Sequence, residues 1–451
     1  MEITRLHTEG NKRKNDFGEI VNLQGVCIAD LAFGYSGGQS RPHWDGDIVA
    51  RLDLLMELLP GTNVIRIAIG GDRVWNLPEE VAQQVDIVKD WCVLKHKWFF
   101  INSHGGWSTA KSRELVNDPT PIVKYHLFWL ERYRNVKEFV GLEVWNEPWW
   151  KPVCPNCGSE DINTSVSPVT CRTCNFQSSD KEVWGNTQQH LRKVMVAVRN
   201  AIYAADPTLL VFVECFGYWR IDPDYINNPL GPQTIYGWDT YWSKWSEPGD
   251  PTKGYYHGPY ATGDYVTGKE RMRNCLLNEN CIKQDNLPVM NLEFGWLIDD
   301  NLVAVKDFYS QMNEFGSDWV CFMWWGNPQN LGIFDWSTNK LLPYGEVMKQ
   351  FMMGGEITAN RTFKGSVSKQ ASSGETVTLV VTKPDGTKDT FTSTTNDVGA
   401  YSTTRAYVPS TTQYSVKVSI PADVEYKAAE AETTFTVDLQ DRTISISVEP
   451  A

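Results

Sequence analysis

The chain has 451 residues, and its 55 Asp and Glu outweigh its 42 Lys and Arg, which gives a formal net charge of −13. Such an acidic protein is a poor match for nucleic acid or an anionic membrane, because both attract a basic surface. No run of about 18 apolar residues occurs, which argues against a membrane-spanning helix. The length predicts one barrel-sized domain and a smaller one.

Short apolar runs alternate with longer amphipathic stretches through residues 1–357, which we predict to be one domain. The amphipathic stretches have apolar residues at three- and four-residue steps, as in helices that pack on a core. About eight alternations predict an α/β fold, a (β/α)8 TIM barrel. A doubly wound open sheet is the alternative, but no G-x-G-x-x-G or G-x-x-x-x-G-K-[ST] loop follows any run. The strand-like runs lie at 21–29, 63–69, 97–103, 139–145, 209–214, 234–242, 287–294 and 319–325.

Two Cys-x2-Cys pairs follow the fourth run, inside an insertion predicted over residues 151–180. Cys154 and Cys157 form the first pair, Cys171 and Cys174 form the second, and thirteen residues from Gly158 to Thr170 separate them. This spacing is typical of a zinc ribbon, in which four thiolates hold one structural Zn²⁺. Disulfides are the alternative, although bridges between such close cysteines are strained. The other cysteines are predicted to be buried apolar residues, with a disulfide between Cys275 and Cys281 left open.

A second domain is predicted over residues 358–451. Every Trp lies at or before Trp336 and every Cys at or before Cys321, whereas the remainder is rich in Thr, Ser and Val. Short alternating runs are separated by turn signals such as Pro-Asp-Gly, which predicts an antiparallel, immunoglobulin-like β-sandwich. Because this part has no Trp, a spacer or stabilising role is a better match than sugar stacking.

Two glutamates follow strand-like runs of the barrel. Asn146-Glu147-Pro148 follows the fourth run, and Glu293 lies at the end of the seventh. The C-terminal ends of barrel strands face the active site. Cleavage of a glycosidic bond with retention needs two carboxyl groups about 5–5.5 Å apart. We therefore predict that Glu147 and Glu293 form such a pair, and that Glu143 belongs to the polar interior and Glu214 is a weaker competitor.

This arrangement resembles clan A of the glycoside hydrolases, and most closely glycoside hydrolase family 5, over roughly residues 20–350. The resemblance implies that Glu147 is the acid/base and Glu293 the nucleophile. It implies further substrate-binding and supporting residues at the ends of other strands. Asn146 would donate to the sugar 2-hydroxyl, and Arg66, ending strand two, would keep the nucleophile ionised. His104 would line the site at the end of strand three.

The resemblance also assigns aromatic residues to the last part of the barrel. Tyr241 would orient Glu293, and Trp325 or its neighbour Trp324 would form the floor beneath the sugar that is cleaved. One position departs from the family pattern, because Asp239 stands where family members usually carry a His two residues before the Tyr. The zinc ribbon begins seven residues after Glu147, so we expect it to wall one end of the cleft and to shape the leaving-group subsites.

The expected reaction is endo-acting hydrolysis of a β-1,4-linked polysaccharide such as cellulose or β-glucan. The alternatives are an endo-β-1,4-mannanase, an exo-acting β-glycosidase of the same clan, and a non-catalytic carbohydrate-binding barrel. The expected partner is a β-linked polysaccharide or oligosaccharide substrate, without nucleic acid or membrane, and we expect a monomer. Residues 1–16 lack the apolar centre of a signal peptide, so an expected extracellular location requires a trimmed secreted form. Sugar stacking is expected from tryptophans near strand ends, at Trp107, Trp149, Trp150, Trp219, Trp242, Trp245 and Trp296.

Overall fold

The computed structural model divides the chain into two compact units, one of Met1–Asp300 with Asp307–Met353, the other of Asn301–Lys306 with Gly354–Ala451. The predicted domain boundary at 357/358 falls outside the described residues. The structure describes residues 3–28, 48–70, 79–104, 109–216, 221–239, 244–247, 250–256, 273–274, 276–277, 287–295, 302–322, 333–335, 338–353, 359–367, 374–407, 410–420, 429–437 and 442–447.

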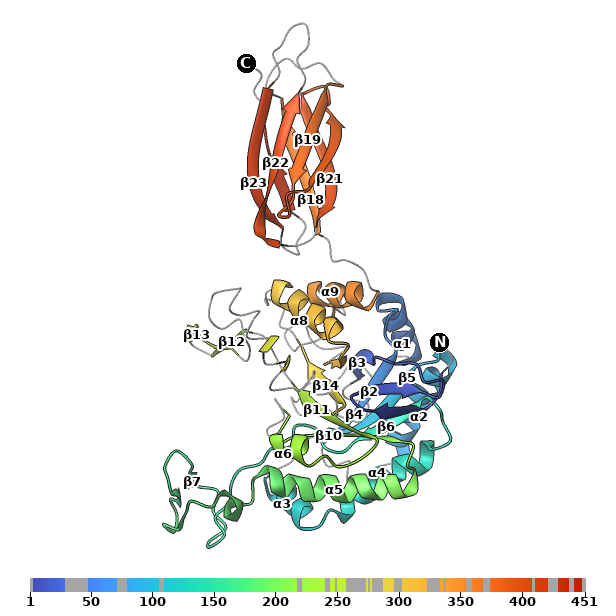
Figure 1. The fold of residues 1–451 in the computed structure, drawn as a ribbon, viewed down its shortest axis with the longest axis vertical. Helices are drawn as coiled ribbons and strands as arrows, with labels where there is room; N and C mark the ends of the chain where they lie inside the picture. Colours follow the sequence, from blue (N-terminus) through green and yellow to red (C-terminus); the bar gives the residue numbers. More distant parts are fainter. Residues whose placement is uncertain are drawn as a thin grey trace. The chain divides into compact units, whose positions relative to one another are not determined.

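Eight strands of the larger unit form a closed barrel in which they follow one another in chain order (Figure 1). All neighbouring pairs are parallel. Each strand overlaps one of the eight predicted runs, and the predicted (β/α)8 barrel is confirmed. The strands are β3 (Gln24–Ile28), β4 (Val64–Gly70), β5 (Trp98–His104), β6 (Phe139–Glu143), β10 (Leu210–Glu214), β11 (Thr234–Asp239), β14 (Val289–Phe294) and β15 (Asp318–Cys321).

Amphipathic helices surround the barrel (Figure 1). In α5, for example, Leu191, Val194, Met195, Val198 and Ile202 are buried at three- and four-residue steps, so one face of this helix packs inward. No helix among the described residues is both long and apolar enough to cross a membrane. The helices are α1 (Ile48–Leu58), α2 (Glu79–Lys95), α3 (Thr109–Asn117), α4 (Thr120–Tyr133), α5 (Gln188–Ala205), α6 (Pro223–Asn227), α8 (Leu302–Glu314) and α9 (Pro343–Met352).

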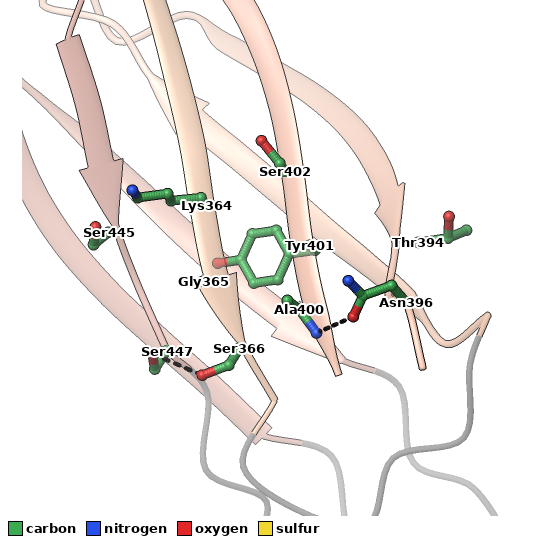
Figure 2. A pocket seen from close by; sticks show the side chains of 10 residues that line it. All are labelled: Lys364, Gly365, Ser366, Thr394, Asn396, Ala400, Tyr401, Ser402, Ser445 and Ser447. Atoms are coloured by element: carbon green, nitrogen blue, oxygen red, sulfur yellow. Dashed lines mark hydrogen bonds between the residues drawn. The ribbon is translucent and has the colours of Figure 1, made fainter. Parts of the chain in front are cut away.

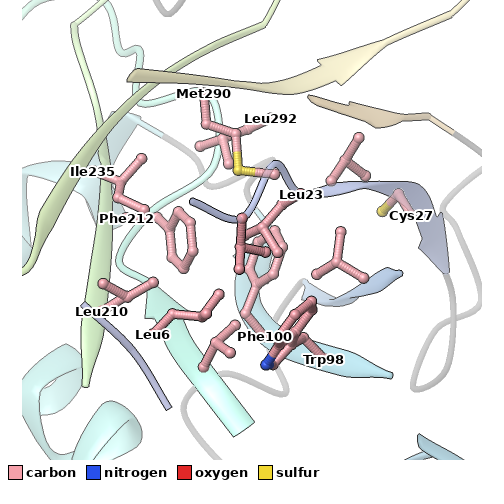
Figure 3. Close-up of a cluster of buried hydrophobic side chains, with 14 of the residues drawn as sticks. Leu6, Leu23, Cys27, Trp98, Phe100, Leu210, Phe212, Ile235, Met290 and Leu292 are labelled. Atoms are coloured by element: carbon pink, nitrogen blue, oxygen red, sulfur yellow. The ribbon is translucent and has the colours of Figure 1, made fainter. Parts of the chain in front are cut away.

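The N-terminal end of the barrel is closed by a hairpin of β1 (Leu6–Glu9) and β2 (Lys12–Asn15). Leu6 joins the apolar cluster inside the barrel, where Phe100 and Phe212 stack with ring centroids 4.4 Å apart (Figure 3). Arg13 of the hairpin forms an ion pair with Asp318, the first residue of β15. Apolar side chains thus fill this end, and the opposite end is left for polar groups.

The insertion after β6 is a small three-stranded antiparallel sheet of β7 (Ile162–Asn163), β8 (Val169–Cys171) and β9 (Gln177–Ser178). A 3-10 helix, Lys181–Trp184, leads back to the barrel. At the base of the insertion, the Val153 N–H donates to the Trp184 carbonyl over 3.1 Å. Two further short hairpins belong to this unit, β12 (Lys244–Glu247) with β13 (Asp250–Tyr256) and β16 (Phe334–Asp335) with β17 (Lys340–Leu341).

The smaller unit contains one three-stranded sheet, in the order β21-β18-β24, and one four-stranded sheet, in the order β20-β19-β22-β23. Side chains from both sheets form one apolar core, as in a β-sandwich. Its immunoglobulin-like character stays a prediction. The strands are β18 (Ala359–Ser366), β19 (Thr376–Thr382), β20 (Lys388–Thr394), β21 (Ala400–Tyr407), β22 (Ser410–Ile420), β23 (Ala429–Val437) and β24 (Arg442–Ser445).

A shallow groove of about 660 Å³ lies on this smaller unit (Figure 2). Half of the residues that line it are Ser or Thr. The one aromatic ring in the lining, Tyr401, is buried and donates through its hydroxyl to the Ile446 carbonyl over 2.6 Å. The groove therefore presents no exposed aromatic face on which a sugar ring could stack.

Candidate active site

Arg66 lies at the centre of the predicted site, with its side chain fully buried. Its guanidinium donates to both carboxylate oxygens of Glu143, over 2.8 and 2.7 Å, and to Glu293 Oε2 over 3.0 Å. It also donates to Asn146 Oδ1 and, over 3.7 Å, to Cys27 Sγ. The prediction that Arg66 ends its strand is wrong, because it is the third of seven residues in β4. Its long side chain brings the charge to Glu293 from within the strand.

Glu147 lies in the loop that follows β6, four residues beyond the end of that strand. Its φ is 43°, in the left-handed region that a residue with a side chain rarely adopts. Two hydrogen bonds fix this turn: the Asn146 N–H donates to the Ser103 carbonyl over 2.9 Å, and the Glu147 N–H donates to Glu214 Oε2 over 2.7 Å. The loop is therefore attached to the strands on both sides of β6.

Three carboxyl groups converge at the C-terminal ends of the strands. One carboxylate oxygen each from Glu147, Asp239 and Glu293 lies within 4.8 Å of the others. Burial, and secondly the charge of Glu293, raises the pKa of Glu147 to about 8, while Arg66 opposes this shift. At neutral pH Glu147 therefore keeps its proton.

Asp239 is the third carboxyl group, and sequence reasoning noted its position only as a departure from the family pattern. It pairs with Glu293 across β11 and β14, at an irregularity in the strand register. Its side chain is 1% exposed, and neither oxygen has a hydrogen-bond partner among the described residues. Burial and the charge of Glu293 raise the pKa of Asp239 well above its ordinary value. Burial beside Glu293 therefore favours the protonated form of Asp239.

His104 ends β5, as predicted, and belongs to the same hydrogen-bond network. Asn102 Nδ2 donates to Glu143 Oε1 over 2.6 Å, so Asn102 Oδ1 faces His104 Nδ1 as an acceptor over 2.9 Å. The imidazole stacks on Phe322, and burial lowers the pKa of His104. The neutral ring thus carries its proton on Nδ1, which leaves Nε2 as an acceptor.

Glu214 is closer to the site than its sequence context suggested. It is fully buried at the end of β10, and burial together with the charge of Asp239 raises the pKa of Glu214. Its position at a strand end was the one available signal, because no motif surrounds it. Its oxygen accepts the Glu147 N–H, so it supports the loop that carries the acid.

The two tryptophans after the Asn-Glu-Pro segment have opposite surroundings. Trp149 is 51% exposed, whereas Trp150 is 1% exposed and stacks on Trp145 with ring centroids 5.6 Å apart. Trp150 is therefore core, and Trp149 alone of the two is free to stack on a sugar. The side chain of Trp245 is not described. The remaining predicted aromatic residues, Tyr241, Trp107, Trp219, Trp242, Trp296, Trp324 and Trp325, lie outside the described residues.

The four cysteines of the insertion also converge. Their sulfur atoms lie within 4.8 Å of one another, and the two closest pairs are Cys154 with Cys174, at 3.5 Å, and Cys157 with Cys171, at 3.6 Å. Neither separation is a disulfide bond, which is about 2.05 Å long. The predicted burial holds for Cys27, Cys92, Cys215 and Cys321, whereas Cys275 and Cys281 lie outside the described residues.

Solved structures with the same barrel include several glycoside hydrolases. A β-glucanase from Saccharophagus degradans is similar with a TM-score of 0.52 and 17% identity, over 78% of this chain and 94% of that chain. The catalytic domain of an endoglucanase from Thermobifida fusca has a TM-score of 0.51 and 12% identity, over 77% and 97%. A family 5 lichenase from Caldicellulosiruptor sp. F32 has a TM-score of 0.51 and 14% identity, over 73% and 92%.

At these identities the similarity establishes the shared fold. No protein-family model matches the sequence, and no curated protein matches it significantly.

Proposed function

We propose that the chain is a retaining β-glycosidase that cleaves polysaccharide internally, with Glu147 as acid/base and Glu293 as nucleophile. The observation that carries the proposal is the approach of their carboxylate oxygens to within 4.8 Å, at the C-terminal ends of barrel strands. Retaining glycosidases hold the two carboxyl groups about 5–5.5 Å apart, whereas inverting enzymes need about 6.5–9.5 Å for an intervening water.

In the first step, a carboxylate oxygen of Glu293 attacks the anomeric carbon while the bond to the leaving sugar breaks. Glu147 transfers its proton to the leaving oxygen, and its raised pKa supports this role. In the second step, Glu147 removes a proton from water, the water oxygen bonds to the anomeric carbon, and the Glu293 carboxylate is released. Because the charge of Glu293 is absent from the covalent intermediate, Glu147 becomes a stronger acid at that stage.

The network around Arg66 supports the binding role proposed for Asn146. Arg66 donates to Asn146 Oδ1, so the Nδ2 group of the same amide is left as the donor for the sugar 2-hydroxyl. Arg66 also forms an ion pair with Glu293 over 3.0 Å, which fixes the orientation of the nucleophile. His104 is proposed to accept a hydrogen bond from a sugar hydroxyl through Nε2. Tyr241, Trp324 and Trp325 remain proposed contacts on the strength of the sequence resemblance.

A β-1,4-linked glucan is the proposed substrate. The barrel neighbours named as β-glucanase, endoglucanase and lichenase support this choice, and the Saccharophagus degradans β-glucanase was solved with cellotetraose. The exposed Trp149 next to Glu147 supports stacking of a sugar ring near the bond that is cleaved. A polymer of this kind cannot enter a cell, so we propose that the enzyme acts outside the cell.

Two experiments test the assigned glutamates, their roles and the proposed substrate. Wild type, Glu147→Gln and Glu293→Gln would be assayed on cellulose, barley β-glucan, xylan and mannan, with Glu131→Gln on the outer helix α4 as the matched control. We expect both site variants to lose activity by at least about 10²-fold and the control to keep it. Full activity in either site variant would overturn the assignment, and a preference for mannan would replace the proposed substrate.

Azide rescue then assigns the roles. With an aryl β-cellobioside whose leaving group needs no proton, Glu147→Ala is expected to give the β-glycosyl azide, because azide attacks the covalent intermediate. Glu293→Ala is expected to give the α-glycosyl azide by direct attack. Interchanged products would reverse the two roles.

A further inference from the structure

The insertion after β6 contains four cysteines that the proposed hydrolysis does not use. We propose that Cys154, Cys157, Cys171 and Cys174 bind one structural Zn²⁺, and that this metal holds the insertion against the segment that follows Glu147. The site is separate from the carboxylates of the barrel, and the inference does not depend on the proposed reaction.

The two halves of the site have the same backbone geometry, displaced by 17 residues in the sequence. In the first half, the Gly158 N–H donates to the Cys154 carbonyl and the Cys154 N–H donates to the Ser159 carbonyl, each over 2.9 Å. In the second half, the Asn175 N–H donates to the Cys171 carbonyl over 2.9 Å, and the Cys171 N–H donates to the Phe176 carbonyl over 2.8 Å.

Each half also ends in a left-handed residue, Gly158 with a φ of 75° and Asn175 with a φ of 60°. The two Cys-x2-Cys turns therefore match both in their backbone hydrogen bonds and in their left-handed residue.

The distances between the sulfur atoms fit tetrahedral zinc. Four thiolates at about 2.3 Å from Zn²⁺ lie about 3.8 Å from one another. The closest pairs, Cys154 with Cys174 and Cys157 with Cys171, are 3.5 and 3.6 Å apart. Because all four positions around the metal are taken by protein sulfur, the ion has no place for water or substrate, and its role is structural.

The insertion is too small to be stable on its apolar core alone. Its strands have two, three and two residues, and its buried cluster consists of Cys154, Cys171 and Trp184 with a few partly buried neighbours. Folded units below about 40 residues usually need a disulfide, a metal or an oligomeric partner. Four free thiols, three of them in this cluster or packed against it and the exposed Cys157 close to them, point to a metal.

The metal also affects the segment beside the proposed active site. Trp150 Nε1 donates to the Gly185 carbonyl over 2.7 Å, and the Val153 N–H donates to the Trp184 carbonyl over 3.1 Å. Trp150 in turn stacks on Trp145, which directly precedes Asn146 and Glu147. A folded insertion therefore fixes the far end of the loop that carries the acid.

Metal analysis of the full chain tests the proposal. Protein purified after growth with zinc is expected to contain about one zinc per chain, and Co²⁺ substituted for it should give the absorption of a tetrahedral thiolate site. The double variant Cys157→Ser/Cys174→Ser is expected to contain none, whereas the matched control Cys92→Ser, in helix α2, should retain it. Iron instead of zinc, no metal, or metal retained in the double variant would overturn the proposal.

If the double variant does not fold, removal of the metal from wild-type protein tests the proposal instead. Removal of zinc with a thiol reagent and a chelator should make residues 150–185 sensitive to limited proteolysis while the barrel strands stay protected. Cleavage that begins in the barrel, or no change in cleavage, would contradict the structural role. A different result is purified protein that contains no metal and has an intact mass lower by the four hydrogen atoms lost when two disulfides form. That result would show that the cysteines are bridged covalently and would overturn the proposal.

Discussion

The Glu147 N–H donates a hydrogen bond to the buried carboxyl group of Glu214 over 2.7 Å. This bond joins the loop after β6 to the end of the neighbouring strand β10. It also accounts for the left-handed backbone of Glu147, because a fixed acceptor offsets part of the conformational cost of a positive φ. The acid is thus positioned through its backbone by a residue from another strand.

Loss of this acceptor should impair catalysis more than loss of the carboxyl charge. Glu214→Ala leaves the Glu147 N–H buried without its partner, which we expect to cost about 1–3 kcal/mol of stability and to lower kcat on the order of 10–100-fold. Glu214→Gln keeps an oxygen in the same place, so its stability and its kcat should both stay close to those of wild type. Urea unfolding and steady-state kinetics of the two variants make the comparison. Equal losses in both variants would show that the carboxyl group itself is required.

The raised pKa of Glu147 predicts the alkaline limit of activity. Because Glu147 must be protonated to assist the leaving group, kcat/KM should fall as the pH rises through about 8. On a dinitrophenyl β-cellobioside, whose leaving group needs no proton, the fall should be much shallower, and Glu147→Gln should lack it. A steep fall near pH 8 in Glu147→Gln would assign the titration to another group.

Asp239 predicts how stability depends on pH. Its pKa in the folded protein lies well above the ordinary value of 3.8, so the folded chain keeps a proton that the unfolded chain releases. The free energy of unfolding should therefore decrease as the pH rises above about 4, by about 1.4 kcal/mol per pH unit for each retained proton. Asp239→Asn, which cannot ionise, should show a shallower decrease in urea unfolding between pH 5 and 7. Parallel curves for the two proteins would mean that Asp239 ionises normally.

Arg66 should be more sensitive to substitution than a surface arginine. Its guanidinium donates to Glu143, Asn146 and Glu293, so Arg66→Lys removes the bidentate bond to Glu143 and reduces the number of hydrogen bonds to the buried carboxylates. We expect a loss of about 3–5 kcal/mol in unfolding free energy and a strong loss of activity. Arg132→Lys, which affects a more exposed ion pair with Asp86, should cost about 1 kcal/mol or less in the same urea titration.

The strands of the barrel could be predicted from the sequence because each is buried on both faces and reads as a continuous apolar run. The glutamate pair could be predicted because Glu147 closely follows one such run and Glu293 lies at the end of another. The position of Arg66 within its strand was predicted wrongly. A long side chain can reach the end of a strand from a residue further back, and the sequence does not show how far it reaches. The opposite exposures of Trp149 and Trp150 depend on loop conformation, which adjacent identical residues cannot reveal.

Glu214 and Asp239 were underestimated for another reason. Each lies at the end of its own strand, and its importance depends on which neighbour the closed barrel brings beside it. Glu214 meets the backbone of a loop that follows β6, and Asp239 faces Glu293 on β14. Such relationships between strands require the register of the barrel and cannot be obtained from motif spacing.

The hydrogen bond between Val153 and Trp184 brings the two ends of the insertion together at one point of the barrel surface. A module whose entry and exit coincide can be gained, exchanged or deleted without any change in the path of the eight strands. Evolution could therefore have added this segment to an existing barrel in a single insertion. Protein engineering can use the same junction to graft other small folds next to Glu147.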